Sequence, residues 1–158
     1  MSMTEALPLT AHPFVRGMAA NHIDRLSRVT RYITVPARRR IFDEGGTADR
    51  CWLIVAGQVA LDLHVPGHGP VVIETLGRGD VIGWSWLFPP YQWMLGAITM
   101  QPTQAFELDG RAVRGLCEAD PILGNELNRR FMAVVVNRLQ ATRIRLLDIY
   151  GRPAAGSP

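Results

Sequence analysis

The spacing of hydrophobic and polar residues changes twice along the chain and divides it into three stretches. Residues 14–27 have helical spacing and predict a helix. Residues 30–108 contain short apolar runs separated by turn-forming residues, which is typical of strands joined by tight turns. Helical spacing returns after residue 110. The apolar positions of the first helix are Phe14, Met18, Ile23 and Leu26.

The middle stretch predicts a mostly β fold with flanking helices. Several short strands at this spacing, with turn signals between them, favour an antiparallel sandwich or roll. The predicted strands cover residues 32–35, 40–42, 51–63 (a long run broken only by Gly57), 71–76, 95–100 and 103–108. A short helix is expected over 111–117. A long helix is expected from Asp120-Pro121 to Tyr150, because Asp caps a helix and Pro suits its first position.

The second half of the long helix carries a second apolar face. Leu127, Phe131 and Val134 lie on one side and are expected to pack on the roll. A different set, spaced by three and four residues, has the repeat of a coiled coil and predicts a homodimer through this helix. A single wide face buried within one chain is the alternative. The repeat comprises Met132, Val135, Leu139, Thr142, Leu146 and Ile149.

Length and composition fit one soluble domain. The 158 residues divide into a flexible tail (1–13), a domain (14–150, with its roll at 30–108 and its C-terminal helices at 111–150) and a disordered tail (151–158). Neither a signal peptide nor a membrane span is predicted, so the expected location is cytoplasmic. Two distant cysteines give no metal or disulfide pattern. The net charge of +3, with arginine as the only basic residue besides histidine, is weak evidence for nucleic acid.

Four motifs in order give the chain a resemblance to a known family. These are the turn at 41–49 (IFDEGGTAD), the strand at 52–59 (WLIVAGQV), the turn at 76–83 (LGRGDVIG) and the helix start at 138–142 (RLQAT). Together they resemble the sensor domain of the catabolite activator protein and fumarate–nitrate regulator superfamily. The resemblance implies a cyclic-nucleotide-binding-type double-stranded β-roll (jelly roll) plus a long C-terminal dimerisation helix.

The same resemblance places the charged contacts to a nucleotide in the segment after Gly83. A glutamate that binds the ribose is expected at the position of Trp84, and an arginine that pairs the phosphate at the position of Leu95. No arginine lies between Arg78 and Arg111. Both charged contacts are therefore absent, and neither cyclic AMP nor cyclic GMP is expected as a cofactor.

Aromatic residues crowd the segment where those contacts would lie. They are Trp84, Trp86, Phe88, Tyr91 and Trp93. They either fill the former pocket as core, line a site for an apolar or planar ligand, or form a surface for a partner protein. Any surviving pocket is expected to involve Gly83, Trp84, Ser85, Trp86, Leu95, Gly96, Thr142 and Arg143, the last two from the long helix as the resemblance implies.

No arrangement of residues predicts catalysis or a metal site. The chain has neither a phosphate-binding loop nor a dinucleotide fingerprint. Eight residues after the long helix are too few for a helix-turn-helix, so direct DNA binding is not expected. The sequence therefore predicts a non-enzymatic regulatory domain that acts as a dimeric adaptor through protein contacts. The alternative is a sensor for an apolar or aromatic small molecule, or for a cyclic nucleotide bound by atypical contacts.

Overall fold

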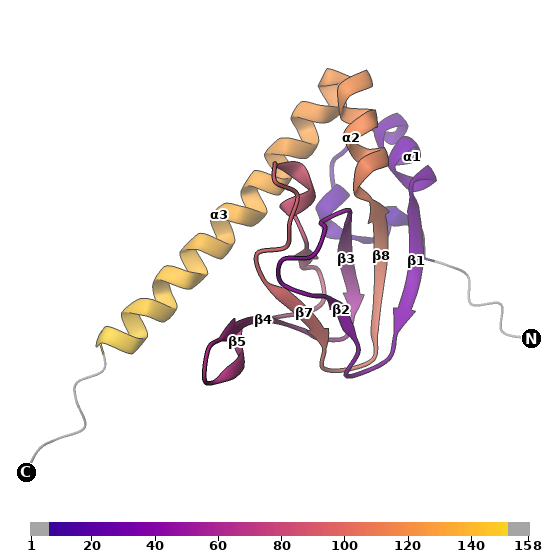
Figure 1. Cartoon of the computed structure of the whole chain (residues 1–158). Helices are drawn as coiled ribbons and strands as arrows, with labels where there is room; N and C mark the ends of the chain where they lie inside the picture. Colours follow the sequence, from indigo (N-terminus) through magenta and orange to yellow (C-terminus); the bar gives the residue numbers. More distant parts are fainter. Residues whose placement is uncertain (1–6, 152–158) are drawn as a thin grey trace, which may run out of the picture.

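The computed structural model describes residues 7–151 and shows a β-roll with a long helix running off it (Figure 1). Residues 1–6 and 152–158, which hold much of both predicted tails, lie outside the described part. The strands are β1 (Thr30–Val35), β2 (Arg40–Phe42), β3 (Arg50–Ala56), β4 (Val59–Val65), β5 (Gly69–Leu76), β6 (Val81–Ile82), β7 (Gly96–Thr99) and β8 (Thr103–Asp109). The helices are α1 (Ala20–Arg28), α2 (Gly110–Ala119) and α3 (Pro121–Gly151), with short 3₁₀ turns η1 (Leu9–Ala11), η2 (Pro13–Val15) and η3 (Ser85–Leu87).

Two four-stranded antiparallel sheets form the roll. Their strand orders are β1-β8-β3-β6 and β2-β7-β4-β5. The long run predicted at 51–63 is two strands, because Gly57 adopts a φ of +107° and reverses the chain there. The mostly β fold with flanking helices that the sequence predicts is confirmed.

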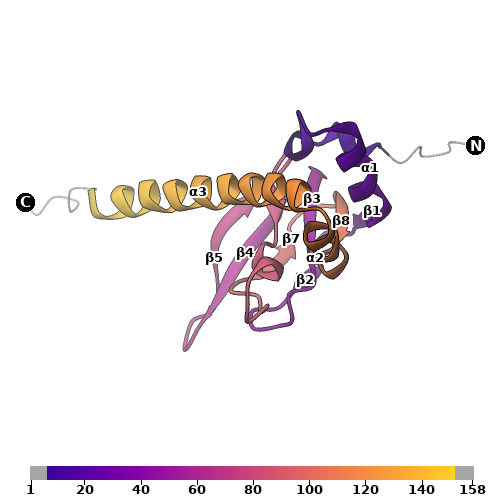
Figure 2. The same ribbon diagram turned by 90° about the horizontal axis from the view of Figure 1, so that it is seen from above.

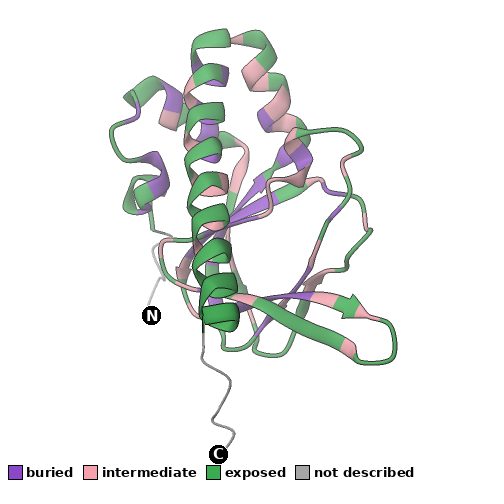
Figure 3. Cartoon of the chain, turned by 90° about the vertical axis from the view of Figure 1, so that its left-hand side faces the viewer, coloured by how far each residue is buried: buried purple, intermediate pink, exposed green. Residues whose placement is uncertain are grey.

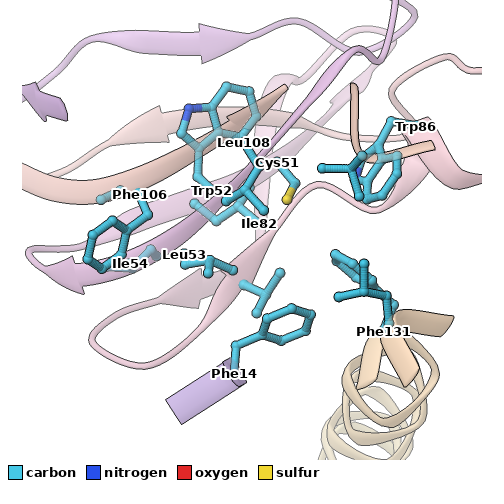
Figure 4. Packing of buried hydrophobic residues seen from close by; sticks show 14 of the residues in the cluster. Phe14, Cys51, Trp52, Leu53, Ile54, Ile82, Trp86, Phe106, Leu108 and Phe131 are labelled. Atoms are coloured by element: carbon cyan, nitrogen blue, oxygen red, sulfur yellow. The ribbon is translucent and has the colours of Figure 1, made fainter. Parts of the chain in front are cut away.

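The central strand β3 is buried because both of its faces are covered. Trp52 stacks on Phe42 of the facing sheet, with ring centroids 5.4 Å apart. On the helical side, Cys51 lies next to Trp86, and Phe14 and Phe131 close the core from the N-terminal segment and α3 (Figure 4). Burial raises the pKa of the Cys51 thiol and keeps it protonated.

The N-terminal segment differs from the prediction. Instead of one helix over 14–27, η2 ends at Val15, Gly17 turns the chain with a φ of +80°, and α1 begins only at Ala20. Residues 7–13, expected to be flexible, pack on the roll. Leu9 is buried in the core. Buried His12 joins the segment to the sheet through the carbonyl of Ile54, 3.1 Å from its Nε2.

Capping residues set the two C-terminal helices where the sequence predicts them. The carboxylate of Asp109 accepts hydrogen bonds from the backbone N–H groups of Arg111 and Ala112 at the start of α2. Asp120 does the same for Ile122 and Leu123 at the start of α3. Both Asp side chains satisfy N–H groups that a helix start leaves free.

The two halves of α3 have different surroundings. Leu123, Leu127 and Phe131 are buried against the roll, and Val134 packs on the same core. Beyond Val134 the helix continues past the roll as a mainly exposed rod (Figures 2 and 3). Among residues 7–151, no helix is long and apolar enough to cross a membrane.

Candidate functional site

A glycine turn leads from β6 into residues 84–93, the aromatic segment, which carries the five crowded aromatic residues. Gly83 adopts a φ of +85°, and a Cβ built on it would lie 2.9 Å from two ring carbons of Trp93 and 3.2 Å from the carbonyl oxygen of Arg50. Only glycine therefore allows the chain to turn this close to Trp93. The turn places Trp84 and Ser85 beside β7 and beside Leu95, the residue that precedes β7.

A cavity of about 310 Å³ opens at this turn. Its walls come from both sheets and from the segment between β6 and β7. The lining residues are Phe42, Leu61, Val81, Ile82, Gly83, Trp84, Ser85, Trp93, Met94 and Leu95. None of them carries a charge. The Ser85 hydroxyl is the one aliphatic hydroxyl among these side chains.

Stacked aromatic rings build the floor of the cavity. The rings of Phe42 and Trp93 lie nearly parallel, with centroids 4.0 Å apart and an interplanar angle of 17°. The ring of Trp52 contacts both, with centroids 5.4 Å from Phe42 and 5.9 Å from Trp93. Trp93 is also held at its backbone, where its N–H donates to the carbonyl of Gly46 and its carbonyl accepts from Gly45. Ring contacts and backbone hydrogen bonds together therefore fix the position of Trp93.

The structure brings four of the eight predicted pocket residues to this cavity: Gly83, Trp84, Ser85 and Leu95. Trp86 instead points into the core, where it is fully buried and meets Phe131 edge-on at 5.3 Å. Gly96 does not line the cavity either, since its Cα packs against the ion pair of Arg40 and Asp62. Thus the aromatic segment both fills core and lines an open site.

Thr142 and Arg143 do not reach the cavity within this chain. Both are exposed on α3, and the Thr142 hydroxyl donates to the carbonyl of Arg138 one turn earlier. The helix presents a different set of residues to the roll. Positions 127, 131, 134 and 138 follow one face, so the roll-facing side chain at this level is Arg138.

Arg138 is a site residue that the sequence pattern did not single out. Its Nη2 donates to the carbonyl of Val81 at 2.7 Å, and its Nη1 lies 3.1 Å from Oε2 of Glu74 in β5. Its guanidinium lies over the ring of Trp84, 5.4 Å from the centroid. Arg138 thus connects α3 to the cavity wall. Arg138 follows Phe131 by seven residues and Val134 by four. This helical spacing is the signal that could have predicted that Arg138 faces the roll.

A second and larger cleft is polar and lies away from the aromatic segment. It has a volume of about 620 Å³ and runs between the end of α1 and the start of α2. Its central carboxylate is Glu107. Burial alone would raise the pKa of Glu107, but hydrogen bonds from Arg31 and Trp52 and the charge of Arg50 outweigh it and lower that pKa. Glu107 is thus paired with Arg31 and Arg50, which makes this part of the cleft a structural ion-pair network.

No group of three or more His, Cys, Asp or Glu side chains within residues 7–151 is arranged to hold a metal ion. The geometry of the described part offers instead an apolar cavity in a β-roll, beside a long helix.

Comparison with known proteins places this fold in a family. Residues 32–120, more than half of the chain, match the cyclic nucleotide-binding domain model. The chain therefore belongs to the cyclic nucleotide-binding domain family. It is 24% identical over 134 residues to a CRP-like cAMP-activated global transcriptional regulator of Mycobacterium tuberculosis, covering 85% of this chain and 58% of the regulator. The chain thus spans little more than half the length of that relative.

Solved structures share the fold at low sequence identity. A cyclic nucleotide-binding domain from Methylobacillus flagellatus has a TM-score of 0.75 and 22% identity, over 88% of this chain and 76% of that one. The regulatory subunit of a cAMP-independent protein kinase A from Trypanosoma brucei has a TM-score of 0.59 and 17% identity, over 66% of this chain and 38% of the subunit. These likenesses support the β-roll fold.

Proposed function

We propose that this chain is a non-enzymatic regulatory domain whose pocket does not take cyclic AMP or cyclic GMP as its physiological ligand. The observation that carries the proposal is the uncharged wall formed by Gly83, Trp84, Ser85 and Leu95. A phosphodiester enclosed there would lose hydration without gaining a charged partner. Fold alone does not decide the ligand, because the fold is shared by a relative described as cAMP-activated and by one described as cAMP-independent.

The expected loss of affinity is large. A hydrogen bond to a charged group contributes about 1.5–3 kcal/mol. Loss of two such contacts weakens binding by roughly 10²–10⁴-fold at about 1.4 kcal/mol per factor of ten. Arg138 does not line the cavity, and its guanidinium lies beside Glu74, with which a phosphate would have to compete.

A thermal melt with millimolar cyclic AMP or cyclic GMP tests the proposal, with 5′-AMP at equal ionic strength as the control. A ligand at about 100 times its Kd adds roughly 2.7 kcal/mol, which would raise the midpoint by several degrees. We expect no difference between the cyclic nucleotides and 5′-AMP. A rise specific to a cyclic nucleotide would contradict the proposal and make the domain a nucleotide sensor with an atypical set of contacts.

The proposal includes a homodimer formed through the second half of α3. Leu139, Leu146 and Ile149 are exposed apolar residues on this rod, and their spacing suits the seam of a paired helix. In such a dimer the domain acts as an adaptor through protein contacts in the cytoplasm. Sensing of a small molecule by the cavity is the second candidate, and the existence of an apolar cavity favours it.

A further inference from the structure

The cavity has the size and chemistry of a ligand site. Its volume of about 310 Å³ is at the lower end of the range of roughly 300–1,000 Å³ for small-molecule pockets. It is about twice the size of an engineered apolar cavity of about 150 Å³ that binds benzene. The cavity therefore has space for two aromatic rings. Its lining consists mainly of aliphatic and aromatic side chains.

The charged groups around this wall are already paired. Arg138 lies on the α3 side, over the ring of Trp84. Its Nη2 donates to the Val81 carbonyl, whereas its Nη1 lies 3.1 Å from a Glu74 oxygen and is buried without a hydrogen-bond partner among the described residues. Arg40 forms a two-bond ion pair with Asp62, at 2.9 and 2.7 Å. An anionic ligand would compete with Glu74 or Asp62 for these arginines, whereas an uncharged ligand leaves both ion pairs intact.

The entrance can adapt while the floor stays fixed. Met94 is 75% exposed at the rim, and an unbranched Met side chain changes rotamer easily to admit a molecule. Phe42 and Trp93, whose rings stack on each other, supply aromatic carbon to the lining. A lining of aromatic and aliphatic carbon favours a ligand with aromatic rings, which packs against it and has few rotamers to lose on binding.

We propose that this cavity binds an uncharged, mainly hydrocarbon molecule of one or two aromatic rings. The proposal deepens the second candidate function, sensing of a small molecule by the cavity, and rests on it, since it names the class of ligand. Trp84 lines the cavity and also carries Arg138 of α3 over its ring. A ligand in the cavity would therefore contact Trp84, which in turn contacts the helix that forms the proposed dimer.

Two fluorescent probes with the same rings and different charge test the ligand class. 2-Naphthol is uncharged at neutral pH, and naphthalene-2-sulfonate carries a sulfonate on the same two fused rings. We expect saturable binding of the uncharged probe at one site per chain. Binding of the sulfonate should be weaker by at least about tenfold, because none of the described residues that line the cavity is charged. Equal or tighter binding of the sulfonate would overturn the uncharged class.

Two cavity variants locate the probe. Ser85→Asp places a carboxylate on the wall, and Leu95→Trp fills the space. Ser85→Ala and Phe88→Ala are the matched controls, since Phe88 is exposed on the same segment and does not line the cavity. Circular dichroism and melting establish that each variant is folded. We expect both cavity variants to weaken binding of the uncharged probe by at least about tenfold, and both controls to bind as the wild type does.

The outcomes separate this proposal from the proposed function. Undiminished binding in both folded cavity variants, or no saturable binding to the wild type, would overturn the ligand class while the insensitivity to cyclic nucleotides stands. If cyclic AMP displaces the probe at micromolar concentration, the cavity is a ligand site but the proposed insensitivity to cyclic nucleotides fails.

Discussion

At the scale of single residues, Gly83 and Trp93 determine whether the cavity exists. The ring of Trp93 fills the space where any other residue at position 83 would place its Cβ. The same ring forms the floor with Phe42. A larger residue at position 83 would therefore push the floor into the cavity or open the turn.

Gly83→Ala should destabilise the fold by about 2–4 kcal/mol. About 1–2 kcal/mol of this is the strain of positive φ, and about 1–2 kcal/mol is the overlap with Trp93. Gly45→Ala is the matched control, because Gly45 has a φ of +83° and a Cβ added there would meet nothing within 4 Å. It should show the strain alone. Equal losses for both variants in urea unfolding would mean that Trp93 moves aside freely.

At the scale of secondary-structure elements, α3 is held to the roll in two different ways. Its first half uses apolar packing of Leu127 and Phe131. Its second half uses arginines: Arg138 reaches Val81 and Glu74, and Arg145 donates to the carbonyl of Ile73 in β5. Apolar contacts fix the start of the rod, and a few polar contacts orient the remainder.

Arg138→Ala should therefore cost more than an ordinary surface change on the same helix. It removes a charged hydrogen bond to Val81 and leaves the half-buried carboxylate of Glu74 unpaired. The expected loss is about 2–3 kcal/mol in the free energy of unfolding. Arg143→Ala is the control, since Arg143 is exposed on the same helix, and it should change stability by less than about 0.5 kcal/mol. Denaturant unfolding would contradict this anchoring role if the two variants were equally stable.

Periodicity and capping residues predict these elements well, but not the contacts between them. The apolar spacing of 127, 131 and 134, together with Asp120-Pro121, predicts α3 and its packed face. The turn glycines and short apolar runs predict the roll. The prediction for the N-terminal segment is wrong because the positive φ of Gly17 interrupts an apolar pattern that is continuous in spacing alone. The role of Arg138 depends on where α3 lies relative to Val81 and Glu74. That is a tertiary contact, which helical spacing does not reveal.

At the scale of the whole molecule, apolar residues of α3 and of β5 are exposed. The rod extends past the roll (Figure 2), and its exposed side faces solvent (Figure 3). β5 ends its sheet, carries exposed Val71 and Val72, and is joined to the rod by Arg145. Apolar residues on a rod and on an adjacent edge strand form a surface of the kind that marks protein interfaces.

The spacing of apolar residues along the exposed half of α3 favours a second copy of the chain as the partner that covers them. Leu139 lies near the middle of the seam and is 52% exposed, so a charge there should disturb an interface without disturbing the core. Leu139→Arg should therefore lower the mass measured by light scattering from that of two chains to that of one.

Gln140→Arg is the matched control for this change. It adds the same charge to the next position, which is also exposed but lies on a different face of the helix, about 100° around the axis. It should leave the mass unchanged. If Leu139→Arg keeps the wild-type mass while melting at the wild-type temperature, the seam is not the interface. The exposed side of α3 would then be available to a partner protein of another kind, and the adaptor role would have to operate without pairing of the long helices.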